Sequence, residues 1–197
     1  MKRAILPLGV LVLVFSGLVA PSAFAQGFIN PFVGVTLTSP KTPTSTATSK
    51  QGFGIALGSL GGFVGGDTEF AYYPEVIDQS SNGLKKSRAV LFSGSTLIGP
   101  KIGPVKIYGA LGVGNMWLNV QKASSILVPN PATLSHTYLT FNVGGGIATP
   151  LVPHFGIRGD LRYHRAFGFK LGDLSNAGLA IDRFDFWRAA GGLLVTF

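Results

Sequence analysis

Residues 183–197, RFDFWRAAGGLLVTF, show the clearest alternation of apolar and polar positions in the chain. Counting back from Phe197, every second position as far as Trp187 is apolar or small, and the intervening set includes Arg188 and Thr196. A period of two predicts a β-strand. An apolar strand with a free edge promotes aggregation, whereas pairing the last strand with the first closes a barrel and removes the edge. A core strand of a secreted β-sandwich is the alternative.

The same alternation divides almost the whole chain into eight segments. The predicted strands are residues 30–39, 52–60, 63–73, 88–98, 105–118, 137–148, 155–165 and 183–197. The predicted short turns contain Gly or Pro and are residues 61–62, 99–104 and 149–154. The predicted long loops are residues 40–51, 74–87, 119–136 and 166–182. Short turns that alternate with long loops are typical of barrels in bacterial outer membranes.

The two faces of the predicted strands are inverted relative to those of a soluble barrel. In residues 155–165 the outward set contains Phe155 and Leu161, whereas the inward set contains Arg158 and Arg162. Apolar side chains outside, with polar or small ones inside, fit a barrel that is surrounded by lipid. Aromatic residues toward the loop ends of the strands form a predicted interfacial girdle: Tyr72, Trp117, Tyr138, Tyr163 and Trp187.

These patterns predict an all-β fold, an eight-stranded antiparallel up-and-down transmembrane β-barrel. After the first 25 residues, the longest stretch without Lys, Arg, Asp or Glu is residues 123–157, and it contains four prolines and a glycine triplet that disfavour a transmembrane helix. In lipid, only helices and closed barrels satisfy the hydrogen-bonding groups of the backbone. The chain has no cysteine, so disulfides cannot supply its stability.

The first 25 residues have the three parts of a secretory signal peptide: the basic pair Lys2 and Arg3, an apolar stretch, and the small-residue site at 23–25. Cleavage there predicts a mature barrel domain of residues 26–197, and an uncleaved membrane anchor is the alternative. Without the basic pair the net charge falls from +8 to +6, because 14 basic and 8 acidic residues remain. The basic residues are scattered and the chain is exported, so we expect no nucleic-acid partner.

The alternation brings six charged residues to the inner face: Asp67, Glu69, Arg158, Asp160, Arg162 and Arg188. Lys106 and Tyr108 also face inward. The interior of an eight-stranded barrel is just wide enough to be filled by side chains, and a buried charge without a partner is strongly destabilising. We therefore predict an ion-pair network that plugs the lumen. A filter for small ions, as in a diffusion porin, is the alternative.

No pattern in the sequence predicts a catalytic, cofactor-binding or metal-binding residue. The glycine runs lack the Lys-Ser/Thr sequence that follows a phosphate-binding loop. No two histidines have the spacing of metal ligands on one face: His136, His154 and His164. A lipid A-modifying enzyme could use Ser135 and His136 with Asp182 or Asp185. The sequence does not show the His-x-Ser pattern of such enzymes, and adjacent strand residues point to opposite faces, so we expect no enzyme activity.

Three stretches carry a more specific signal: PFVGVTL at 31–37, FNVGGGIATPLVPHFGIRGDLRYHR at 141–165 and DFWRAAGGLLVTF at 185–197. Together they resemble the small eight-stranded outer-membrane barrels, which include the OmpA transmembrane domain, OmpX and the opacity-type adhesins. The resemblance implies a location in the cell outer membrane. It also implies that Leu193, Val195 and Phe197 form a carboxy-terminal signal read by periplasmic chaperones and the barrel-assembly machinery.

The partners that this interpretation predicts are outer-membrane lipids and lipopolysaccharide, whose phosphates suit a basic protein. We expect a monomer with a structural or surface-interaction role through four outer loops, because recognition concentrates in loops on a rigid scaffold. The loops carry no motif that identifies an extracellular ligand. A small diffusion porin is the second interpretation, and a lipid A-modifying enzyme is the third.

Overall fold

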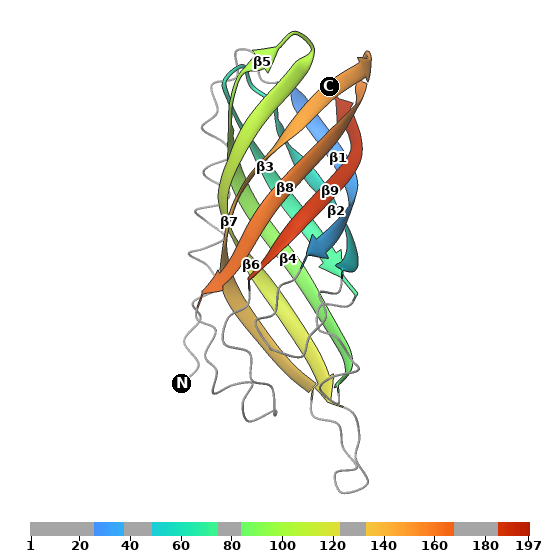
Figure 1. Ribbon diagram of the computed structural model, residues 1–197, viewed down its shortest axis with the longest axis vertical. Helices are drawn as coiled ribbons and strands as arrows, with labels where there is room; N and C mark the ends of the chain where they lie inside the picture. Colours follow the sequence, from blue (N-terminus) through green and yellow to red (C-terminus); the bar gives the residue numbers. More distant parts are fainter. Residues whose placement is uncertain (1–25, 38–48, 75–83, 123–132, 168–184) are drawn as a thin grey trace, which may run out of the picture.

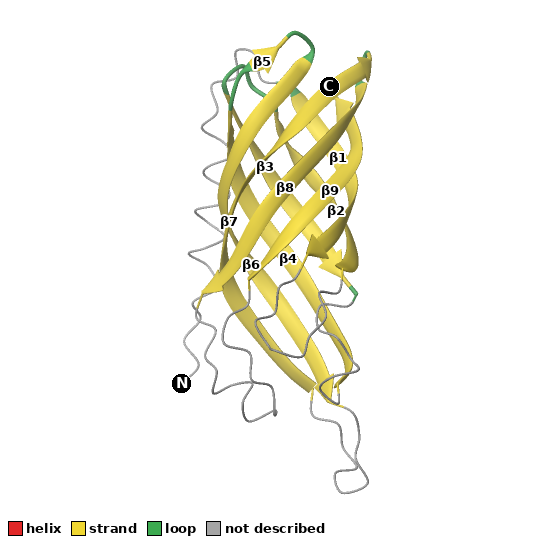
Figure 2. Ribbon diagram, in the orientation of Figure 1, coloured by secondary structure: helices red, strands yellow, loops and turns green. Residues whose placement is uncertain are grey.

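The computed structural model describes residues 26–37, 49–74, 84–122, 133–167 and 185–197, and it places their strands in one closed sheet (Figure 1). The strands are β1 (Gly27–Leu37), β2 (Ser49–Ser59), β3 (Val64–Tyr73), β4 (Leu84–Ile98), β5 (Lys101–Ile102), β6 (Val105–Lys122), β7 (Thr133–Val152), β8 (Phe155–Phe167) and β9 (Asp185–Thr196). Short turns connect them at one end of the barrel (Figure 2). Within the described residues, no helix is long and apolar enough to cross a membrane.

Every pair of neighbouring strands is antiparallel, and the order around the sheet is β4-β3-β2-β1-β9-β8-β7-β6. β4 pairs with β6, which closes the sheet, so each of these eight strands has two neighbours. The two-residue β5 pairs only with β6 and belongs to the turn between β4 and β6. The predicted eight-stranded antiparallel up-and-down barrel is confirmed.

The short turns and both ends of the described chain lie at one end of the barrel, which we call the turn end (Figure 1). The strands run from there to the opposite end, which we call the loop end. The connecting segments at the loop end, residues 38–48, 75–83, 123–132 and 168–184, lie outside the described residues. Three strands, β4, β6 and β7, extend beyond the others at this end (Figure 1).

Several strand boundaries differ from the sequence prediction. β6 continues to Lys122 and β7 begins at Thr133, so both strands enter the segment predicted as the loop 119–136. The predicted turn at 149–154 shortens to Pro153 and His154, because β7 pairs with β8 as far as Val152. His154 has a φ of 68°, in the left-handed region, which fits the third position of a type II turn with proline at the second.

The side chains alternate between an exposed apolar surface and a buried interior. Outward residues such as Val33, Leu111 and Leu193 are 64%, 52% and 63% exposed. Inward residues on the same strands, such as Phe32 and Tyr108, are buried. The face assignment made from the sequence is thus confirmed for these strands, and it leaves an apolar outer wall that water would not solvate well.

Glycines on the inner wall make room for the large inward side chains. A Cβ atom on Gly144 would lie 2.7 Å from the Cα of Arg162, and one on Gly112 would lie 2.8 Å from Asn142 Nδ2. The missing side chain at Gly112 lets Ser95 Oγ donate to Asn142 Oδ1 across it at 3.2 Å. The narrow lumen therefore depends on alternating small and large residues.

Candidate functional site: a charged network in the barrel interior

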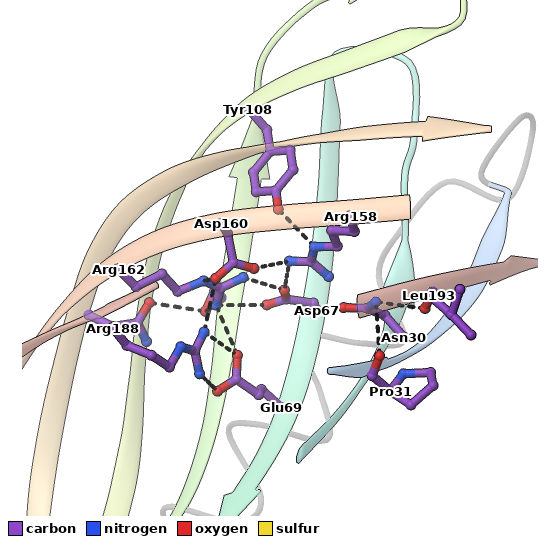
Figure 3. A network of polar contacts seen from close by, with 12 residues as sticks. Asn30, Pro31, Asp67, Glu69, Tyr108, Arg158, Asp160, Arg162, Arg188 and Leu193 are labelled. Atoms are coloured by element: carbon purple, nitrogen blue, oxygen red, sulfur yellow. Dashed lines mark hydrogen bonds and ion pairs between the residues drawn. The ribbon is translucent and has the colours of Figure 1, made fainter. Parts of the chain in front are cut away.

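Charged side chains from three strands meet in the middle of the barrel (Figure 3). β3 carries Asp67 and Glu69, β8 carries Arg158, Asp160 and Arg162, and β9 carries Arg188. In the strand order, three strands separate β3 from β8 in either direction, so these two strands stand opposite each other. Carboxylates from one wall therefore meet arginines from the opposite wall.

Asp67 accepts hydrogen bonds from two guanidinium groups. Arg158 Nη2 lies 2.5 Å and Arg162 Nη2 lies 2.6 Å from Asp67 Oδ2. Arg162 Nη1 also donates to Ser95 Oγ at 3.0 Å and lies 3.7 Å from Glu69 Oε2. One carboxylate on β3 thus holds two arginines of β8 across the lumen.

Arg188 joins the remaining carboxylates to this group. It makes a bidentate pair with Glu69, in which Nη1 donates to Oε1 and Nη2 donates to Oε2, the latter at 2.9 Å. Arg188 Nη2 also donates to Asp160 Oδ1 at 3.0 Å, and Asp160 Oδ2 lies 3.4 Å from Arg158 Nη2. Three arginines and three carboxylates therefore form one connected network whose formal charges cancel.

The network is almost completely removed from solvent. The side chain of Arg158 is 1% exposed, those of Arg162 and Arg188 are 0% exposed, and Asp160 is the most exposed member at 7%. Desolvating such charges costs several kcal/mol each, and only close, well-oriented partners offset that cost. Every member is thus required by the others, because removing one leaves a buried charge with too few partners.

Aromatic residues hold the arginines in place. Tyr108 Oη accepts a hydrogen bond from Arg158 Nε at 2.7 Å. The guanidinium carbon of Arg158 lies 5.0 Å from the centre of the Phe28 ring, and that of Arg188 lies 5.0 Å from the centre of the Phe32 ring. These are cation–π distances. The sequence prediction missed Phe28 because it began the first strand at residue 30, although Phe28 shares the inward parity of Asn30 and Phe32.

Apolar side chains fill the barrel on both sides of the network. Toward the turn end, Phe28, Leu97 and Leu194 are each at most 1% exposed. Toward the loop end the buried residues are Tyr73, Leu91, Met116, Leu118, Tyr138 and Phe186. The sequence predicted a polar or small interior, and this is wrong at the two ends. Close packing favours apolar groups wherever no charged partner is within reach.

Lys106 lies at the turn end of the lumen and is only 3% exposed. Its Nζ donates to three backbone carbonyl oxygens, those of Gly61 at 2.9 Å, Gly62 at 2.7 Å and Gly99 at 2.7 Å. The ammonium group thereby joins the turn between β2 and β3 to the turn that follows β4. The alternation places Lys106 inside, but no sequence pattern predicts that backbone carbonyls are its partners.

Four of the five predicted girdle residues face outward near the loop end. Trp117 and Trp187 are 37% and 45% exposed. Tyr163 packs against Trp187 with ring centres 5.4 Å apart, and Tyr163 Oη donates to Asp185 Oδ2 at 2.6 Å. Tyr72 packs against an outward phenylalanine on β2.

Tyr138 does not belong to this girdle. It is only 5% exposed and lies inside the barrel. It shares the inward parity of Thr140 and Asn142 on β7, so the alternation itself requires the inward position. The girdle prediction includes Tyr138 because it lies near the end of a strand, and that position does not determine which face its side chain occupies.

The end of β9 lies on the outer wall next to β1. Leu193 and Phe197 are 63% and 73% exposed, and Val195 is half-buried between its neighbours on β1 and β8. The backbone of Phe197 exchanges two hydrogen bonds with that of Gly27, at 3.0 and 3.1 Å. The three residues predicted to form the assembly signal therefore share one outward face.

The residues considered for catalysis or metal binding form no visible site in the described part of the chain. Asp182 and the side chains of Ser135 and His136 lie outside the described residues. His164 is fully buried and stacks on Phe186 with ring centres 5.1 Å apart, far along β8 from the turn that contains His154. Among the residues whose positions the structure describes, no three His, Asp or Glu side chains are grouped so that they could hold a metal ion.

The sequence matches no protein-family model and no curated protein sequence. Solved structures do resemble the barrel. Neisserial surface protein A is 15% identical with a TM-score of 0.60, covering 87% of this chain and 97% of that one. A major outer membrane protein from Thermus thermophilus is 13% identical with a TM-score of 0.62, covering 88% and 99% of the two chains.

Ail, the attachment invasion locus protein of Yersinia pestis, is a third similar structure. It is 16% identical with a TM-score of 0.57, covering 88% of this chain and 99% of Ail. At these identities the likeness concerns the fold. The chain therefore has the fold of small eight-stranded outer-membrane barrels.

We expect Arg162→Leu to destabilise the folded barrel by about 3–5 kcal/mol, because Asp67 and Glu69 would each lose a buried partner. The free energy of unfolding is measured by urea titration in lipid vesicles. The matched control is Arg165→Leu on the same strand, whose side chain is exposed, and this change should stay within about 0.5 kcal/mol.

The free energy of unfolding of Arg162→Lys should lie between those of Arg162→Leu and Arg165→Leu, because lysine keeps the charge but lacks the two parallel N–H donors of a guanidinium group. Equal stability of Arg162→Leu and Arg165→Leu would show that the network contributes nothing to the fold.

Proposed function

We propose that the chain is an integral protein of the bacterial outer membrane, exported by residues 1–25 and folded as residues 26–197. We propose a sealed lumen, and a structural or surface-interaction role that is carried at the loop end. The observation that carries the proposal is the continuous filling of the interior. A neutral ion-pair network crosses the barrel, and buried apolar residues lie on both sides of it.

The outer wall supports the membrane location. Its apolar residues are exposed all around the barrel, and aromatic residues gather near the loop end, as at a lipid–water boundary. In barrels of this type the short turns face the periplasm and the longer connections face outward. We therefore propose outer-membrane lipids and lipopolysaccharide as the surroundings of a monomeric barrel.

The filled lumen disfavours the diffusion porin. Lys106 lies across the turn end, and the three network arginines are held by carboxylates, so none of these four cations is available to guide an ion. We likewise propose no enzyme activity. Asp185, one of the two acids considered for it, faces outward and accepts a hydrogen bond from Tyr163.

The purified protein should give no stable conductance steps in planar lipid bilayers, because buried side chains fill the interior. A porin reconstituted under the same conditions serves as the positive control for insertion. Reproducible open steps of uniform size from the wild-type protein would favour the diffusion porin instead.

The carboxy-terminal signal can be tested separately from barrel stability. Phe197→Ala keeps the two backbone hydrogen bonds to Gly27, so refolding of the purified chain in vitro should change little. In cells the same change should lower the amount of heat-modifiable barrel in the outer-membrane fraction severalfold, because the assembly machinery would lose the terminal aromatic residue. Phe197→Tyr is the control that keeps an aromatic ring. Normal assembly of Phe197→Ala would contradict the signal.

Three basic residues that lie close together, an exception in an otherwise scattered set, offer one concrete form of surface interaction. Lys85, Lys86 and Arg88 lie at the start of β4, at the loop end. Such clusters bind polyanions. One structurally similar protein, Ail, was solved in complex with the heparin analogue sucrose octasulfate. We therefore choose heparin as the probe for a ligand at this end.

Replacing Lys85, Lys86 and Arg88 together by Ala should make the detergent-solubilised protein elute from immobilised heparin at lower salt. The attraction between these basic residues and heparin, which salt screens, would provide most of the retention. Lys101→Ala at the turn end is the control and should elute like the wild type. Weak retention of the wild type, or elution unchanged in the triple variant, would exclude polyanion binding by this cluster and leave the structural role.

A further inference from the structure

The seam between β1 and β9, where the first strand meets the last, contains an interruption in the middle of its ladder. Backbone pairing runs through Ile29↔Val195 and resumes at Phe32↔Gly192. The positions between them, Asn30 and Pro31, have no paired residue on β9. The other two ladder irregularities, near Leu84 on β4 and Pro150 on β7, lie at strand ends.

The interruption follows from the hydrogen-bonding pattern of antiparallel strands. The backbones of Gly27 and Phe197 exchange two hydrogen bonds, so every second residue of β1 in the same register directs its N–H toward β9. Counting along the two strands, the carbonyl of Leu193 should accept from residue 31. Residue 31 is proline, which has no N–H to donate.

A side chain supplies the missing donor. Asn30 Nδ2 donates to the carbonyl oxygen of Leu193 at 2.7 Å (Figure 3), and Asn30 is only 2% exposed. The amide reaches the carbonyl over Gly192, where a Cβ atom would lie 2.7 Å from Nδ2. The bond therefore needs Asn30 on one strand and both Gly192 and Leu193 on the other, in this register.

We propose that Asn30 is a register-specific latch on the closing seam of the barrel, and that its binding partner is the carbonyl of Leu193 in the chain's own last strand. Before closure β1 is an edge strand, and an edge proline prevents pairing with a wrong strand at that position. After closure the amide of Asn30 satisfies the carbonyl that Pro31 leaves without a donor. The pair thus protects the open edge and completes the closed wall.

The latch is tested with the full mature chain refolded into lipid vesicles. Asn30→Ala should lower the folding equilibrium constant about tenfold, because the Leu193 carbonyl loses its donor. Pro31→Ala restores a backbone N–H at that position. In this background Asn30→Ala should cost less than about twofold, and the restored backbone amide should be protected from hydrogen exchange in the double variant.

Asn142→Ala is the matched control, because Asn142 is a buried inward asparagine on β7 that does not touch the seam. Its cost should be the same in the wild-type and Pro31→Ala backgrounds. An equal cost of Asn30→Ala in both backgrounds would overturn the latch. If Asn30→Ala does not refold at all, recovery of folding in the double variant supports the latch, and failure of the double variant overturns it.

The edge-protection half of the proposal has its own measurement. Pro31→Ala alone should at least double the share of soluble aggregate formed when the denatured chain is diluted into buffer with limiting detergent, because β1 would then present an uninterrupted edge. An unchanged share would overturn this half. The hydrogen bond from Asn30 would still be tested by comparing the cost of Asn30→Ala in the wild-type and Pro31→Ala backgrounds.

Discussion

The structure depends on one constraint: its strands must satisfy their backbone hydrogen bonds within the protein, as the proposed lipid surroundings would require. A sheet meets that requirement only when its first and last strands pair. The pairing of β1 with β9 therefore decides whether the fold exists, and the mutual hydrogen bonds of Gly27 and Phe197 mark where it begins. The period of two along the sequence follows from the same constraint, because one face of every strand meets the outside and the other meets a narrow lumen.

The lumen imposes the second requirement, that a tube of eight strands be filled without unpaired charge. Arginine is long enough to reach from β8 to β3, and the glycines of β7 leave space beside it. The charges of the six network residues cancel, so the network adds no net charge to the lumen. Apolar layers above and below exclude water, which strengthens each ion pair. Filling and charge neutralisation thus support each other.

Alternation predicts which face of the barrel wall a residue lies on. It does not predict the residue's position along the barrel axis or its partner across the lumen. Asp67, Arg158 and Arg162 could be placed inside from parity alone. That these charges pair follows from the need to neutralise buried charge. Which carboxylate meets which arginine does not follow, because β3 and β8 are opposite strands that share no register. The prediction places Tyr138 in the outward girdle because it lies near a strand end, but its parity directs it inward, and it is buried. The predicted end of β6 is too early because the apolar-outward pattern stops there: apolar Leu118 lies on the inward face and polar Asn119 follows on the outward face.

Proline in a strand normally indicates an edge, yet a closed barrel has none. Pro31 resolves this contradiction by lying on a strand that is an edge until the barrel closes, and Asn30 supplies the donor that Pro31 lacks afterwards. The rule that proline belongs on an edge strand is therefore met in the unclosed barrel, although the closed barrel violates it. The same reasoning separates the two ends of the barrel. The filled interior and the β1–β9 seam serve the fold. Under the proposed surface-interaction role, we therefore expect variation that alters recognition without damaging the fold at the loop end.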